Sequence, residues 1–362
     1  MKRRLFRNIE PTFFAGLLDD PLLLVRIRPL MASCLFDCGR VHHLAKRVLK
    51  SVSALFISHA HMDHFMGIDT FIRANHISPR VFDIFGPPGI AHKLAGKLAG
   101  YDWNLAEPEW GTFRAHEIHP DRILTANFPG PEGFPCRFAE ETPRAGHTIY
   151  HNQYLEIKAE LCDHGIPALI FRASERPAFL VDEAKIEREG LVRGDWLREL
   201  KGRFYAGTMA QGDITVLRRR EGKVAEEPVE DVAALYETIR REDEPAGIGY
   251  VTDIGAGEEN LAKVETLLKG VTLLVCECAF LAGEREKALV SSHFCTSDLN
   301  LLMDRLRPRF VLPMHFSRSY SGKTSLLYEQ LEMPQGVTLL RLPEHLTPRP
   351  LLTGEVPKLF AG

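Results

Sequence analysis

The sequence predicts a layered α/β fold. Short apolar, β-branched segments recur from one end of the chain to the other, and turn-forming residues bound each of them. Segments with helical periodicity lie between several of these predicted strands, an alternation typical of sheets packed against helices. The 362 residues would suit about two average domains, but α/β proteins of this length also fold as one. We therefore expect a single domain over residues 1–362, with a charged insertion or arm at about 183–244.

Nine segments are predicted to be strands, and several of them end in polar residues where a loop would begin. They are residues 22–29, 33–39, 54–61, 81–89, 153–165, 168–173, 247–255, 271–280 and 309–316. Helical periodicity predicts four helices, at residues 89–100, 229–241, 258–268 and 296–306. Thr296 or Ser297 could be the N-cap of the last of these helices.

The stretch 183–244 differs in composition from the rest of the chain. Between Asp213 and Glu244, 10 of the 32 residues are acidic and 6 are basic, which predicts a solvated surface. A pair of surface helices is the preferred interpretation, and a segment that grips a substrate is the alternative. The basic run Arg218–Arg220 could touch RNA phosphates, although a solvated face is again the preferred interpretation.

Composition limits the partners and the compartment. The 45 Lys and Arg residues against 48 Asp and Glu give a net charge of −3, so no extensive basic surface for nucleic acid is predicted. Seven cysteines, an odd number without zinc-finger spacing, indicate reduced thiols. The basic start is interrupted before any signal-type apolar stretch, and no run of about 18 apolar residues occurs. We therefore expect a cytoplasmic protein without a membrane partner.

The most informative segment follows the predicted strand that ends near Ile57. His59, His61, Asp63 and His64 fall within six positions, and their imidazole nitrogens and carboxylate oxygen suit Zn²⁺, Mn²⁺ or Fe. At a turn from strand to loop, His59 and His61 could face one ion while Asp63 and His64 face another. A surface loop rich in histidine is the alternative, but it has no need of all these residue types in register.

Further ligand-type residues lie just beyond three other predicted strands. They are His164, Asp253 and His315. A lone histidine in such a place is more often a satisfied loop residue than a ligand. Three such residues, in a chain that already carries the His-x-His-x-Asp-His segment, favour a dinuclear metal site.

The motifs together resemble those of a known family. They are Phe-Asp-Cys-Gly at 36–39, the segment 56–67, Phe-Gly-Pro at 85–87, Asp-His-Gly-Ile-Pro at 163–167, Asp253, Cys-Glu-Cys-Ala-Phe at 276–280, His-Phe-Cys-Thr at 293–296 and His-Phe-Ser at 315–317. In this order they resemble the metallo-β-lactamase fold superfamily and, within it, the ribonuclease Z family of endonucleases, which mature tRNA 3′ ends. The resemblance covers most of the chain.

The resemblance implies a four-layer αββα sandwich with two divalent metal ions at one edge, Zn²⁺ being favoured over Mn²⁺ or Fe. It implies that one ion is bound by His59, His61 and His164, the other by Asp63, His64 and His315, and that Asp253 bridges them. It also implies catalytic roles. Asp63 orients the attacking water or accepts its proton, and His293 protonates the leaving oxygen while Glu277 holds its ring. Asp37 could fix the orientation of a ligand imidazole, or it could be an ordinary strand-end aspartate.

The function implied is that of a phosphodiesterase that cleaves the 3′ trailer of a tRNA precursor through a metal-bridged hydroxide, as a possible homodimer. Three departures from the family pattern bear on the substrate: Ile254 follows Asp253, the order after His-Phe-Ser is Arg318-Ser319-Tyr320, and residues 188–202 lack the prolines of the family's arm. Two alternatives are therefore kept. One is a hydrolase of a small phosphodiester or ester, and the other is a non-catalytic member that binds RNA or protein.

Overall fold

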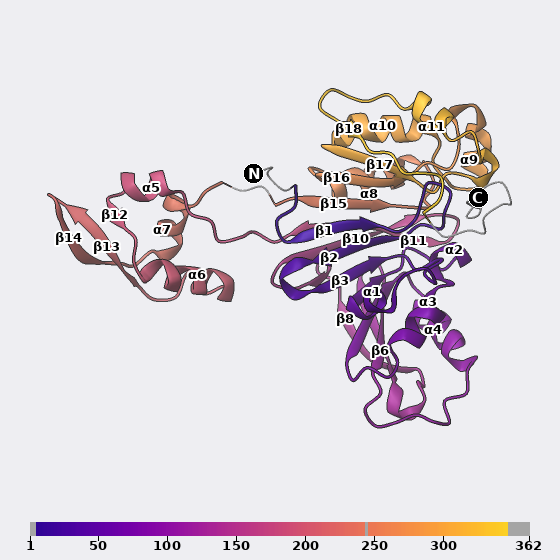
Figure 1. Cartoon of the computed structure of the whole chain (residues 1–362), viewed down its shortest axis with the longest axis horizontal. Helices are drawn as coiled ribbons and strands as arrows, with labels where there is room; N and C mark the ends of the chain where they lie inside the picture. The colour runs from indigo at the N-terminus through magenta and orange to yellow at the C-terminus, as the bar shows by residue number, and fades with distance from the viewer. Residues whose placement is uncertain (1–4, 243–244, 347–362) are drawn as a thin grey trace, which may run out of the picture. The chain divides into compact units, whose positions relative to one another are not determined.

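The computed structural model describes residues 5–242 and 245–346 (Figure 1). The chain divides into two compact units. The first unit comprises the described residues up to His151, then Leu155–Glu175, and the described residues from Ala246 onward, whereas the second comprises Asn152–Tyr154 and the described part of Arg176–Pro245. The stretch 183–244 lies within this second unit.

The first unit contains two β-sheets, of which the first has eight strands in the order β1 to β8. Strands β1 to β3 are antiparallel, β3 to β6 are parallel, and β6 to β8 are again antiparallel. The bounds are β1 Ile9–Phe13, β2 Leu23–Ile27, β3 Ala32–Phe36, β4 Val52–Phe56, β5 Val81–Gly86, β6 Thr112–Ile118, β7 Arg122–Pro129 and β8 Arg137–Pro143.

The second sheet has seven strands in the order β18-β17-β16-β15-β11-β10-β9. Its half from β15 to β18 is parallel, and its half from β9 to β15 is antiparallel. The bounds are β9 Thr148–His151, β10 Leu155–Asp163, β11 Pro167–Glu175, β15 Gly247–Val251, β16 Leu273–Glu277, β17 Phe310–Met314 and β18 Thr338–Leu339.

The two sheets stack through aromatic side chains. Phe36 and Phe56 of the first sheet pack edge-on against Phe171 of the second, with ring centroids 5.6 and 5.9 Å apart, and Phe36 also contacts Tyr250. Buried rings in this arrangement contribute more than their buried area alone. The site described below lies at the edge of this stack, where strand ends from both sheets meet.

Helices pack on the outer faces of the stack. Those on the first sheet share a core with Leu49, Phe71 and Leu94, and those on the second share a core with Val264 and Leu302. The α-helices are α1 Lys46–Ser51, α2 Met62–Phe65, α3 Ile68–Asn75, α4 Ile90–Ala99, α8 Glu258–Leu268, α9 Arg285–Val290, α10 Thr296–Leu306 and α11 Ser325–Gln330, and the 3₁₀ turns are η1 Arg28–Leu30, η2 Gly130–Glu132, η3 Ala282–Glu284 and η4 Arg318–Tyr320. The predicted αββα sandwich is thereby confirmed.

Most predicted elements have a counterpart. Each of the nine predicted strands overlaps a β-strand, and the bounds predicted for 258–268 and 296–306 coincide with α8 and α10. The predicted N-cap of α10 is wrong, because the cap is Cys295. Its backbone N–H donates to the Asp298 carboxylate at 3.0 Å, which forms a capping box without the usual Ser or Thr.

The second unit has its own sheet and core. An antiparallel sheet is formed by β12 Leu191–Val192, β13 Ile214–Arg220 and β14 Lys223–Val229, and the unit's helices are α5 Glu183–Arg188, α6 Trp196–Ala206 and α7 Val232–Ile239. Trp196, Leu200 and Val216 are buried among these elements. The prediction of a pair of surface helices is therefore wrong. In the described residues of both units, no helix is long and apolar enough to cross a membrane.

Candidate metal centre

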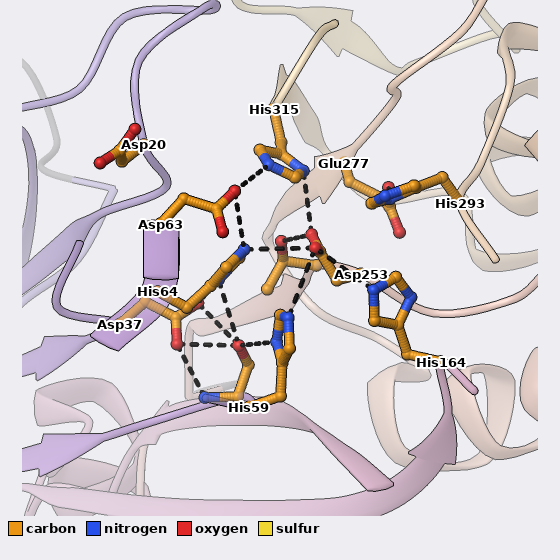
Figure 2. Close-up of polar contacts among 12 residues, drawn as sticks. Asp20, Asp37, His59, Asp63, His64, His164, Asp253, Glu277, His293 and His315 are labelled. Carbon is orange, nitrogen blue, oxygen red and sulfur yellow. Dashed lines mark hydrogen bonds and ion pairs between the residues drawn. The ribbon is translucent and has the colours of Figure 1, made fainter. Parts of the chain in front are cut away.

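The seven predicted ligands follow strands of both sheets, and Figure 2 shows all of them except His61. His59 and His61 follow β4, and Asp63 and His64 belong to the short helix α2. The remaining three follow strands of the second sheet: His164 follows β10, Asp253 follows β15 and His315 follows β17. The structure brings their side chains into two clusters, His59, His61, His164 and Asp253 in one, and Asp63, His64 and His315 in the other. A third group, Asp253, Glu277, His293 and His315, shares Asp253 with the first cluster and His315 with the second.

Asp253 lies at the centre of this arrangement. Its Oδ2 lies 3.2 Å from His64 Nε2, 3.6 Å from His59 Nε2 and 3.7 Å from His164 Nε2. Its Oδ1 lies 2.9 Å from His315 Nδ1 and accepts a hydrogen bond from the Thr252 hydroxyl. Four imidazoles therefore converge on one buried carboxylate, which would be a ligand shared by the two sets if metal ions were bound.

The residues present fit divalent cations. Three buried ring nitrogens of the site, His59 Nε2, His64 Nε2 and His315 Nδ1, face Asp253 without forming a well-directed hydrogen bond. Buried polar atoms without a hydrogen bond are rare and costly, and metal ions would satisfy all three. His59 and His64 are 0% exposed, which is inconsistent with an ordinary surface loop rich in histidine. The nitrogen and oxygen donors of these residues could therefore hold divalent metal ions.

In the site, protonated imidazoles balance the negative charges of the Asp253 and Asp63 carboxylates. Burial lowers the pKa of His59 to about 2, with nearby His64 acting in the same direction. Burial also acts to lower the pKa of His64 and of His315, but the Asp253 carboxylate outweighs it, raising the pKa of His64 well above its usual value and that of His315 to about 10. Burial acts to raise the pKa of Asp63, but its hydrogen bond with His315 and the nearby His64 lower it instead. Cations with two positive charges would displace those protons.

Asp37 holds the His64 ring from behind. Its Oδ2 lies 2.9 Å from His64 Nδ1 and also accepts from the Tyr250 hydroxyl at 2.9 Å. Its Oδ1 accepts from the backbone N–H and the hydroxyl of Ser58 at 2.7 and 2.8 Å. These contacts support the interpretation of Asp37 as an orienting residue. Sequence reasoning missed Ser58 and Tyr250, and only the position of Ser58 next to His59 offered a signal.

Three of the residues that build the site have a left-handed backbone. The φ angles of Asp37, Asp253 and His315 are 55°, 49° and 55°, and all three follow the end of a strand closely. Such a conformation costs a non-glycine residue about 1–3 kcal/mol and persists only where the surroundings enforce it. The tight turns aim these side chains into the site instead of along the strand.

His293 and Glu277 form a pair beside the metal ligands. His293 Nδ1 lies 2.8 Å from Glu277 Oε2, and its ring centroid lies 5.6 Å from that of His315. Burial acts to lower the pKa of His293, but the Glu277 carboxylate outweighs it and raises that pKa. The other Glu277 oxygen accepts from the backbone N–H of Ile254 at 2.8 Å, so the unusual side chain at 254 leaves this contact intact.

A cleft of about 540 Å³ opens beside these residues. Sequence analysis predicted only Asp63, His293 and His315 among its lining. The others come from four loops and from α2: Leu18, Asp19, Asp20, Arg40, Met62, Met66, Ala279, Phe280, Phe316, Ser317 and Arg318. Arg318 pairs with the buried Asp20 at 2.7 Å.

Fold and site define a metal-dependent hydrolase of the β-lactamase superfamily. Residues 33–149 match the family model described as beta-lactamase superfamily domain. A solved metallo-β-lactamase fold protein of Bacillus subtilis, YhfI, has the same fold, with a TM-score of 0.50 and 11% identity over 92% of this chain and 96% of that one.

Two curated relatives define the family further. The chain is 33% identical to ribonuclease Z of Deinococcus radiodurans, covering 79% of this chain and 82% of the relative. It is 24% identical to ribonuclease Z of Geobacillus kaustophilus, covering 82% of this chain and 81% of that relative. The chain belongs to the ribonuclease Z family, and it is a metal-dependent hydrolase of that type.

Proposed function

We propose that this protein is an endoribonuclease that removes the 3′ trailer from tRNA precursors. The observation that carries the proposal is the pairing of the Asp253 cluster with a partly buried His–Glu pair beside it, because a phosphodiesterase needs both charge neutralisation and a proton donor. The two curated relatives described above, both named ribonuclease Z, support RNA as the substrate.

The ligand sets suit two ions. His59, His61 and His164 would hold one, Asp63, His64 and His315 the other, and Asp253 lies between the two sets. Two such cations would lower the pKa of water and neutralise phosphate oxygens. Zn²⁺ is our proposal for the native metal, with Mn²⁺ or Fe as alternatives, since mixed imidazole and carboxylate ligands suit all three.

Asp63 and His293 would move the protons. The low pKa of Asp63, caused by its hydrogen bond to His315 and by nearby His64 against the effect of burial, keeps its carboxylate ionised and able to accept a proton from the attacking water. The raised pKa of His293 favours the protonated ring, which can donate a proton to the leaving 3′ oxygen. Glu277 orients that ring through Nδ1, which leaves Nε2 for the substrate.

Two further expectations stay proposals. A homodimer is expected from the family resemblance. A cytoplasmic location is supported by the cysteines, all seven of which are free thiols.

The test is cleavage of a tRNA precursor with a 3′ trailer, with Zn²⁺ or Mn²⁺ added and the His64→Ala protein as control. We expect cleavage just after the acceptor stem by the wild type alone. Hydrolysis of bis(p-nitrophenyl) phosphate with an intact precursor would refute tRNA as the substrate and favour a small phosphodiester. Failure to bind metal or to hydrolyse either substrate would refute the enzyme and favour a binding protein.

A further inference from the structure

The cleft beside the metal site contains two arginines in different electrostatic states. Arg318 pairs with Asp20 at 2.7 Å, and the Asp20 side chain is only 4% exposed, so this positive charge is balanced within the protein. Arg40 also lines the cleft and is exposed, and it makes no ion pair or hydrogen bond with any residue that the structure describes. An unbalanced cation at the cleft is available to an anionic ligand.

The backbone that carries Arg40 is attached to the metal-binding segment. The Cys38 N–H donates to the His64 carbonyl, and the Gly67 N–H donates to the Cys38 carbonyl, both at 2.8 Å. A Cβ on Gly39 would lie 1.9 Å from the Asp63 carbonyl oxygen, so only glycine allows this approach. Arg40, the next residue, therefore starts from a backbone position fixed relative to Asp63 and His64.

We propose that Arg40 binds a phosphate of the RNA chain next to the one that is cleaved. A guanidinium binds phosphate through charge-assisted hydrogen bonds, and one on a fixed backbone loses less freedom on binding. The cleft thereby selects a substrate with at least two neighbouring phosphates over a small diester with one. This inference rests on the proposed function, since it assumes a polynucleotide substrate.

The experiment compares kcat/KM for a tRNA precursor in the wild type, in Arg40→Ala and in Arg40→Lys, over a range of salt concentrations. We expect Arg40→Ala to lower kcat/KM roughly 10- to 100-fold, mainly through KM, as loss of a charge-assisted contact implies. The slope of log(kcat/KM) against log[salt] should fall by about 0.7, the value for one phosphate contact on a single strand. Arg40→Lys should keep most of that slope, because the charge remains.

Arg47→Ala is the matched control, because Arg47 is also exposed and lies seven positions further on, outside the lining of the cleft. The ratio of precursor cleavage to bis(p-nitrophenyl) phosphate hydrolysis should fall for Arg40→Ala and stay constant for Arg47→Ala. An equal loss on both substrates, or metal content below that of the wild type, would show a structural role and overturn the proposal. If Arg40→Ala keeps the kcat/KM and the salt slope of the wild type, the role of Arg40 is overturned and the proposed function stands. If the wild-type protein leaves the precursor intact, the proposed function and the role of Arg40 are both overturned.

Discussion

Replacing Asp37 by Asn tests whether the buried carboxylate behind His64 sets the affinity for metal. The two side chains have nearly the same shape, but the amide offers one acceptor and one donor group where the carboxylate offers two acceptors. The amide oxygen of the variant could still accept from the Ser58 N–H, which donates to Asp37 Oδ1 at 2.7 Å. At the position of Oδ2, however, an NH₂ group would face the Tyr250 hydroxyl and His64 Nδ1, each now 2.9 Å away.

The size of the effect follows from these contacts. Asp37 and His64 are 0% exposed and Tyr250 is 1% exposed, so water cannot replace the lost acceptor. One or two unsatisfied buried donors cost about 1–3 kcal/mol each, which gives a loss of about 1–6 kcal/mol in the unfolding free energy. A misoriented metal-binding imidazole typically loses about 10- to 100-fold in metal affinity. Tyr250→Phe is the control, because it removes one donor and leaves the Asp37–His64 contact in place.

Two measurements decide the matter. Competition with a chromogenic chelator gives the affinity for Zn²⁺, and urea unfolding of the metal-free protein gives the free energy of unfolding. We expect Asp37→Asn to lower both the affinity for Zn²⁺ and the free energy of unfolding much more than Tyr250→Phe does. Tyr250→Phe should lower the free energy of unfolding by about 1 kcal/mol. Wild-type metal affinity in Asp37→Asn would refute the argument that Asp37 orients the His64 ring.

Three further predictions concern the other parts of the molecule. His64→Ala should bind less metal and lose most turnover, which metal analysis and an activity assay would check, whereas His293→Ala should keep its metal and lose about 10²- to 10⁴-fold in kcat. Because Glu277 raises the pKa of His293, the active protonated form persists to higher pH and activity falls as pH rises through that pKa. Glu277→Gln should move this alkaline limb of the kcat profile to lower pH, and an unmoved limb would contradict the pairing. Leu200→Ala, at a side chain 0% exposed in the second unit, should cost about 2–5 kcal/mol and expose that unit to protease without changing metal content.

The metal-ligand candidates could be found from sequence because their chemistry and their positions coincide. Each candidate follows an apolar run, and the carboxyl ends of parallel strands meet at one edge of a sheet. The partners of these ligands were not accessible in this way. Tyr250 reaches Asp37 across 213 positions, and only the register and stacking of the two sheets bring them together. No local pattern around Tyr250 distinguishes it from an ordinary core tyrosine.

The sheet of the second unit was missed for a different reason. In β13 the buried residues Ile214 and Val216 alternate with exposed ones, but the strand ends in three arginines that conceal the pattern. The turn to β14 places Glu221 and Gly222 at φ angles of 51° and 79°, which is hairpin geometry without the usual Asn-Gly or Asp-Gly sequence. Charge density is a property of the solvent-facing side chains, so it could not report on the buried face.

The metal centre depends on both sheets of the first unit. His59 follows β4 of the first sheet and His64 lies in the helix α2 after it, whereas His164, Asp253 and His315 follow strands of the second sheet. The aromatic contacts between Phe36 or Phe56 and Phe171 fix the relative position of the sheets, so they also fix the distances between the two halves of the ligand set. Metal binding by these residues would therefore stabilise the stacking of the sheets as well as the local loops, because the complete set of candidate ligands exists only in the packed state.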